Sequence, residues 1–296
     1  MNNSADIPLE AAAIGSNVPP GHRSVVIHSV FRTAVNLQPS SGGNLIMLLS
    51  HESADHPQGI RLATAQDFTT HWLQPNSTGR INDDGIFLDR PEDIAPLRIS
   101  FSKAIRLKPE PLPIIQHLGA SWKACVEFLD SLQMRANTDL RIQTLVAHGS
   151  AQGILGERLT TAALELGEAI VQTGVLNSAH RAISKLVGLG SGLTPSGDDF
   201  LCGFLTAAHC RHGAQSQFLL ELKRAVLTRL ENTNAISATF LRCAAEGKVC
   251  KALHELAKAL QSGTHCRNAT RRLCAFGHSS GMDITTGFLY GLTVWK

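Results

Sequence analysis

The chain has 296 residues, of which 43% are hydrophobic and 17% are charged, and this composition is typical of a globular protein. The formal net charge of +3 includes no dense run of Lys and Arg, so a nucleic-acid partner is not indicated. No apolar run approaches the roughly 20 residues that cross a bilayer. The first 22 residues also lack the basic start and apolar core of a secretory signal. We therefore expect a cytoplasmic protein with no membrane partner.

The seven cysteines agree with this expectation. Their number is odd and no two of them form a Cys-x-x-Cys pair, so neither a disulfide framework nor a zinc site is indicated. Free cysteines are among the most buried residues in proteins. We predict that these thiols are small apolar groups in the core.

The N-terminal third is predicted to be rich in β-structure. Residues 1–23 combine Asn, Ser, Ala, Pro and Gly, and we interpret them as a poorly ordered leader. Short apolar runs separated by turn residues then extend from residue 24 to residue 108 and predict a small antiparallel sheet or barrel. The candidate strands are 24–31, 44–50, 59–63, 85–88 and 97–101. The sequence Asn82-Asp83-Asp84-Gly85 predicts a tight turn.

The remaining residues, 109–296, are predicted to form an all-α domain, which makes the fold class α+β. The alternating prolines in Pro109-Glu110-Pro111-Leu112-Pro113 favour an extended connector. Apolar residues then recur at steps of three and four, as in amphipathic helices. Helices are expected near 199–212, 216–231, 234–246, 249–261, 265–276 and 282–294. Gly213, Gly247 and Gly263 stand where C-terminal caps of three of these helices belong.

One Gly-rich motif, residues 188–200, stands out between two helical segments. Glycines that lead into a helix N-terminus can form an anion site, because free N–H groups and the helix dipole favour negative charge. Hydroxyl side chains would add donors for phosphate or carboxylate oxygens. The same residues could instead form only a sharp turn. The candidate substrate-binding residues in this motif are Gly190, Ser191, Gly192, Thr194, Ser196, Gly197 and Asp198.

The motif has a second copy near the C-terminus. Residues 196–205 and 280–289 both have the pattern Ser-Gly-x-Asp-x-x-x-Gly-Phe-Leu, with six identities in ten positions. Asp199 corresponds to Asp283, and Gly203 to Gly287. A mid-helix glycine costs roughly 1 kcal/mol relative to alanine. Matched glycines therefore predict that two helices cross closely and bring both Ser-Gly-x-Asp loops together; two unrelated packing glycines are the alternative.

Adjacent helical residues point about 100° apart, so Asp198 and Asp199 do not face one ligand equally. We assign Asp198 mainly to capping, and Asp199 with Asp283 to catalysis as a general base, an acceptor for a substrate N–H, or a Mg²⁺ ligand. His278 is a third catalytic candidate, able to donate to an anion or carry a proton. Ser280 and Gly281 complete the second loop.

The segments 190–201 and 277–283 together resemble a bacterial family that includes the small subunit of oxamate carbamoyltransferase, from allantoin breakdown in purine catabolism. The resemblance covers the helical part well and the β-rich part loosely. It implies conversion of oxalurate and phosphate into oxamate and carbamoyl phosphate, together with other subunits. On this reading the Gly-rich motif binds an anionic small molecule, and Asp199 and Asp283 orient the ureido nitrogens.

Two other functions remain open at this point. The chain could be a Mg²⁺-dependent enzyme for a nucleotide or phosphorylated metabolite, with Asp199 and Asp283 holding the metal. It could also be a non-catalytic partner subunit in which the loops serve only folding. The carbamoyltransferase reading requires no metal, although Mg²⁺ is compatible with it.

Overall fold

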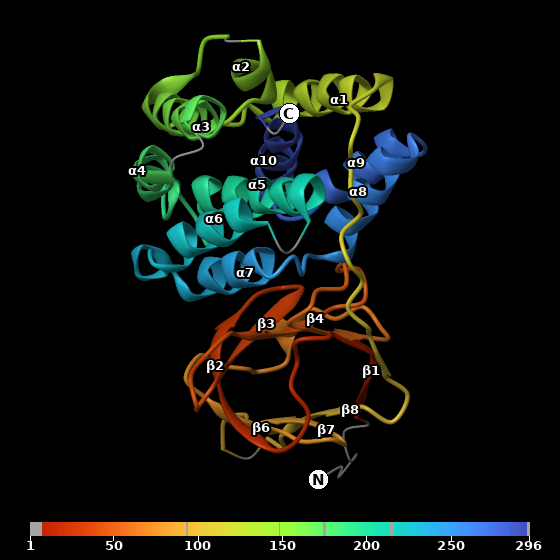
Figure 1. Cartoon of the computed structure of the whole chain (residues 1–296). Helices are drawn as coiled ribbons and strands as arrows, with labels where there is room; N and C mark the ends of the chain where they lie inside the picture. The colour runs from red at the N-terminus through yellow and green to blue at the C-terminus, as the bar shows by residue number, and fades with distance from the viewer. Residues whose placement is uncertain (1–7, 93, 148, 174–175, 214–215, 295–296) are drawn as a thin grey trace. The chain divides into compact units, whose positions relative to one another are not determined.

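The computed structural model describes residues 8–92, 94–147, 149–173, 176–213 and 216–294. The chain forms two compact units, Met1–Pro109 and Glu110–Lys296, called here the barrel unit and the helical unit (Figure 1). The fold class is α+β, as the sequence predicts. Within the described residues, no helix has both the length and the apolar character that crossing a membrane requires.

The strands of the barrel unit form one sheet in the order β5-β4-β3-β2-β6-β7-β8-β1. Because β5 also pairs with β1, these eight strands of the described chain close into a barrel. The short strand β9 pairs with the second half of β1. The strands are β1 Leu9–Ile14, β2 Arg23–Val30, β3 Ala34–Pro39, β4 Ile46–Leu49, β5 Gly59–Leu62, β6 Thr78–Ile81, β7 Gly85–Leu88, β8 Leu97–Ser100 and β9 Ile105–Arg106. A 3₁₀ turn, η1, covers Phe68–Thr70.

Alternating side chains fill the interior of this barrel. Val25 and Ile27 of β2, for example, are buried in the core, whereas Ser24 and His28 on either side of them are exposed. The predicted tight turn between β6 and β7 is present, and the Asn82 side chain stabilises it by accepting the N–H groups of Asp84 and Gly85.

The prediction of a poorly ordered leader over residues 1–23 is wrong for its described part. Residues 9–14 form β1, which pairs with β5, β8 and β9 and completes the barrel. The Ala-rich sequence of this strand carries little β-propensity of its own. Its conformation comes from hydrogen bonds to strands that are distant in the sequence. Residues 1–7 lie outside the described residues.

The helical unit contains α1 Ala120–Ala136, α2 Ile142–Val146, α3 Gly153–Thr173, α4 Leu176–Leu186, α5 Ser196–His212, α6 Gln217–Leu227, α7 Ala235–Ala245, α8 Lys251–Ser262, α9 Cys266–Cys274 and α10 Ser280–Val294, with a 3₁₀ turn, η2, over Leu230–Asn232. Figure 1 shows α5 and α10 at its centre. Helix α5 contacts α4, α6 and α7, whereas α10 contacts α1, α2, α3 and α9. Gly213 and Gly263 cap α5 and α8, as predicted, and Gly247 follows the end of α7.

Helices α5 and α10 cross with their backbones in contact, as the matched glycines predict. A Cβ atom on Gly203 would collide with the carbonyl oxygen of Ile284, and one on Gly287 would collide with that of Phe200. Phe200 and Ile284 occupy equivalent positions in the two copies of the motif. The contacts are therefore reciprocal, and the two helices are related by a local pseudo-two-fold axis.

We expect Gly203→Ala and Gly287→Ala each to lower the free energy of unfolding by at least about 2 kcal/mol, because the added methyl group meets a rigid backbone. Chemical denaturation measures this loss. Gly149→Ala is the matched control, since a Cβ there makes only ordinary van der Waals contact. Equal stability of all three variants would contradict the crossing.

Candidate functional site

The Gly-rich loop, residues 187–195, connects α4 to α5 and folds tightly. Gly188 has a φ of 74°, and a Cβ atom on it would collide with the carbonyl oxygen of Asn232. Gly190 and Gly192 also have positive φ values, of 135° and 92°. The Asn234 side chain, which caps α7, donates to the carbonyl oxygen of Leu193 at 2.9 Å. The loop is thus held against the start of α7.

The second loop repeats this geometry between α9 and α10. The N–H of Gly197 donates to Leu189 at 2.8 Å, and that of Gly281 donates to Phe276 at 2.9 Å. Each of these glycines also lies against the last turn of the preceding helix, where no side chain would fit. The structural repeat is therefore longer than the sequence repeat and includes the end of the helix before each loop.

The two loops meet at the pseudo-two-fold axis. The hydroxyl groups of Thr194 and Ser280 are hydrogen-bonded at 2.6 Å and link the first loop to the start of α10. The hydroxyls of Ser280 and Thr194 also lie near the Asp199 carboxylate and lower its pKa. The hydroxyl of Ser196 has the same effect on Asp283. Each aspartate thus faces the serine that begins the opposite copy. The structure brings together Thr194, Ser196, Asp199, Ser280 and Asp283.

Burial dominates the electrostatics of the paired aspartates, Asp199 and Asp283, which are each only 1% exposed. Burial raises the pKa of Asp283 to about 7, against the opposing effect of the Ser196 and Ser279 hydroxyls. Burial also raises the pKa of Asp199 well above its usual range, and the neighbouring Asp283 charge adds to this rise. Both carboxyl groups therefore keep their protons to higher pH than an exposed aspartate does.

Three buried oxygens of this pair accept no well-formed hydrogen bond among the described residues, although serine hydroxyls lie near both carboxylates. They are Oδ2 of Asp199 and both carboxylate oxygens of Asp283. A buried carboxylate oxygen without a donor is costly, so such groups persist mainly where a ligand or proton satisfies them. The arrangement is able to accept N–H groups, exchange a proton or bind a cation.

Asp198 does not occupy the N-cap position that the sequence predicted for it. Helix α5 begins at Ser196 and its N-cap residue is Pro195, so Asp198 lies inside the first turn. Its carboxylate accepts the N–H of Gly188 at 2.8 Å and the hydroxyl of Thr233 at 2.5 Å. Burial raises the pKa of Asp198. The Asp198 carboxylate therefore links the Gly-rich loop to Thr233. It points away from the paired aspartates, as expected for adjacent helical positions.

Some of the N–H groups that the sequence suggested for anion binding are engaged by backbone carbonyl oxygens. The N–H of Gly197 donates to Leu189, and those of Asp198 and Asp199 donate to Pro195. The N–H groups of Gly190, Ser191 and Gly192 have no described partner, so they and the hydroxyls at the start of each helix remain as donors, whereas the buried groups are carboxylates. The site is therefore richer in acceptors than the glycine pattern suggested.

The other predicted residues lie at the edge of the site. Ser191 and Gly192 are exposed in the loop, and Gly190 is half-buried. His278 is exposed in the turn before α10, and no described interaction joins it to the paired aspartates. Sequence reasoning missed Thr233, which holds Asp198, and Ser279, which acts on Asp283. Only the position of Ser279 beside the repeated motif could have indicated it.

The cysteines are free, as predicted, and six of the seven are buried. Burial raises the pKa of Cys202 well above its usual range, with the nearby Asp199 charge as the next cause. No group of three or more His, Cys, Asp or Glu side chains in the described chain is arranged to hold a metal ion. Asp199 and Asp283 are the residues at the site that could contribute carboxylate ligands.

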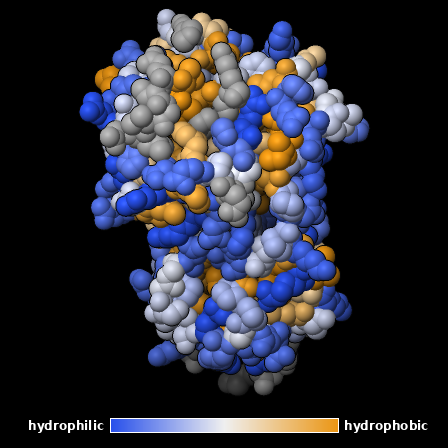
Figure 2. Space-filling model, in the orientation of Figure 1, coloured by the Kyte–Doolittle hydropathy of each residue, from blue (hydrophilic) through white to orange (hydrophobic). Residues whose placement is uncertain are grey.

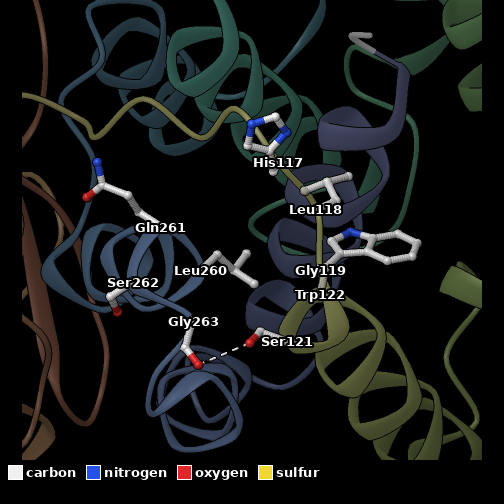
Figure 3. Close-up of a pocket in the computed structure, with 9 residues that line it drawn as sticks. All are labelled: His117, Leu118, Gly119, Ser121, Trp122, Leu260, Gln261, Ser262 and Gly263. Atoms are coloured by element: carbon white, nitrogen blue, oxygen red, sulfur yellow. Dashed lines mark hydrogen bonds between the residues drawn. The ribbon is translucent and has the colours of Figure 1, made fainter.

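A separate pocket of about 230 Å³ lies between the start of α1 and the end of α8 (Figure 3). Ser121 donates to the carbonyl oxygen of Gly263 across it at 3.1 Å. His117 is the ionisable residue among those that line it, and none of them belongs to the repeated motif. We place the functional site at the paired aspartates, because their unpartnered buried oxygens require a ligand or proton and the pocket wall has no comparable group.

The raised pKa of Asp283 predicts a pH-dependent effect of Asp283→Asn. Since the folded state binds this proton more tightly than the unfolded state, ionisation removes stability as pH rises from about 4 to about 7. We expect the variant to be more stable than the wild type by about 1 kcal/mol or more at pH 8, with the difference shrinking towards pH 4. Denaturant titrations at both pH values test this, and a pH-independent difference would contradict it.

Comparison with known families agrees with the resemblance seen in the sequence. Residues 186–292 match the family described as oxamate carbamoyltransferase subunit AllH. This match includes both Ser-Gly-x-Asp loops and the crossing of α5 and α10. Residues 9–107, which contain the barrel strands, match the AllH family N-terminal domain. No solved structure matches the chain. The chain belongs to the family of the oxamate carbamoyltransferase subunit AllH.

Proposed function

We propose that this chain is the subunit that binds the carbamoyl donor in an oxamate carbamoyltransferase. The reaction converts oxalurate and phosphate into oxamate and carbamoyl phosphate. The observation that carries the proposal is the pair of buried, unpartnered aspartates within the segment that matches the family. The substrate would lie at the pseudo-two-fold axis, between the two Ser-Gly-x-Asp loops.

Hydrogen-bond chemistry supports this substrate class. A ureido group carries N–H donors on both sides of its carbonyl, and the three unpartnered oxygens of Asp199 and Asp283 are acceptors. The hydroxyls of Thr194 and Ser280 would donate to the carbonyl oxygen as it gains negative charge. Donors and acceptors of the site would thus complement those of the substrate.

A proton balance further supports a role for the paired aspartates. A phosphate oxygen attacks the carbamoyl carbon, the bond from this carbon to the inner nitrogen breaks, and that nitrogen must take a proton to leave as the amide of oxamate. A carboxyl group with a pKa of about 7, as for Asp283, is suited to supply it at neutral pH. Asp199 would meanwhile orient the terminal amino group.

Exposed apolar side chains support the association with other subunits that the family name implies. Ile154 is 80% exposed, Trp72 is 67% exposed, and Met134 and Val171 are each 60% exposed. Figure 2 shows hydrophobic residues interrupting the hydrophilic surface of both units. Such patches commonly mark surfaces that bind other proteins.

The free thiols support assembly in a reducing, cytoplasmic compartment.

We expect Asp199→Asn to lower kcat for phosphorolysis of oxalurate by about two orders of magnitude or more, because it removes an orienting or proton-exchanging group. The measurement is carbamoyl phosphate formation by the chain co-purified with its partner subunits. The variant should remain folded, since the amide has the shape of the carboxylate it replaces.

The control is Glu246→Gln, which removes an exposed carboxylate paired with Lys248 in the same unit. Its turnover should equal that of the wild type. Near-normal turnover of Asp199→Asn in an active complex would exclude the paired aspartates from the reaction.

A further inference from the structure

The proposed function raises an electrostatic conflict at the site. Phosphate is an anion, and it must approach a carbamoyl carbon held beside two buried carboxyl groups. A carboxylate repels phosphate most strongly where water is excluded. Within the first turn of α5, the N–H groups of Gly197, Asp198 and Asp199 do not compensate, because they are bonded to carbonyl oxygens. The groups that shift the pKa values of the pair are hydroxyls and carboxylates, and neither Lys nor Arg is among them.

The donor atoms around the pair suit a hard cation. Asp199 supplies one unpartnered oxygen and Asp283 supplies two. The hydroxyls of Ser196 and Ser280 lie beside the opposite carboxylates, so the oxygens approach from both sides of the pseudo-two-fold axis. Carboxylate and hydroxyl oxygens are the ligands that Mg²⁺, Mn²⁺ and Ca²⁺ prefer.

The tight burial of the pair also suits a small ligand. Both side chains are 1% exposed, so a ligand that lies directly between the two carboxylates must be small. Mg²⁺ in particular is often held by one or two carboxylates and completes its coordination with water and substrate phosphate oxygens.

We propose that a divalent cation, Mg²⁺ in its natural setting, binds on the pseudo-two-fold axis between Asp199 and Asp283 and links them to the phosphate substrate. One oxygen of each ionised carboxylate would bind the ion, and the third unpartnered oxygen would remain free for an N–H group of the carbamoyl donor. With the ion bound, the proton for the leaving nitrogen would come from the attacking phosphate in place of Asp283. This inference rests on the proposed function for the identity of the anion, whereas the cation site itself rests on the geometry of the pair.

The test uses Mn²⁺ as the probe on the full-length chain. Electron paramagnetic resonance of free Mn²⁺ gives its binding curve, with and without inorganic phosphate, and Mg²⁺ is added as competitor. We expect saturable binding that Mg²⁺ displaces. Asp199→Asn and Asp283→Asn should each weaken it by about tenfold or more. Glu246→Gln, at the exposed carboxylate, should bind like the wild type.

Circular dichroism checks that each variant is folded. If an Asn variant unfolds, Ser280→Ala replaces it, because this change removes a hydroxyl beside Asp199 and leaves both carboxylates intact. Its expected loss of Mn²⁺ affinity is smaller but measurable. Absence of saturable binding under both conditions, or unchanged binding by the folded variants, overturns the cation site.

Turnover of the assembled transferase separates this proposal from the proposed function. Carbamoyl transfer that survives exhaustive chelation of divalent cations would reject the cation and leave the function in place. Mn²⁺ binding that depends on both aspartates, in a complex that transfers no carbamoyl group, would reject the function and leave the cation site in place.

Discussion

The close crossing of α5 and α10 is the constraint on which the helical unit depends. Gly203 and Gly287 let the two backbones touch, and each glycine lies against the carbonyl oxygen that corresponds to the other's partner. Side chains at these positions would separate the helices. The remaining helices pack around this central pair, with α6 and α7 on α5, and α1, α2 and α9 on α10.

The crossing also determines the chemistry of the site. Because both helices begin near the axis, their first turns face each other and Asp199 and Asp283 are buried together. Burying two carboxyl groups opposes folding unless protons or a ligand compensate. The Gly-rich loop lies next to this arrangement. Asp198 binds the loop at Gly188, and Asn234 binds it at Leu193. A costly, well-fixed arrangement of this kind is typical of functional sites.

Much of this organisation is visible in the sequence where the determining interactions are local. The turn at Asn82 and the helix-ending glycines, such as Gly263, follow from backbone preferences of a few residues. The repeated Ser-Gly-x-Asp pattern and the matched glycines indicated the helix crossing, because a glycine in mid-helix needs a packing reason. Strand β1 was missed, since an Ala-rich segment becomes a strand only when distant strands offer it hydrogen bonds.

By itself, the sequence determined the fold class, the repeat and the pairing of Asp199 with Asp283 that defines the candidate site. Hydrophobic periodicity and the positions of glycine are properties of the chain that need no tertiary contact. The tertiary structure alone decided what Asp198 binds, since its partners Gly188 and Thr233 belong to two segments that only folding brings together. It also decided that the two carboxylates are buried together with few donors around them, because hydrogen-bond partners and burial exist only once the helices have packed.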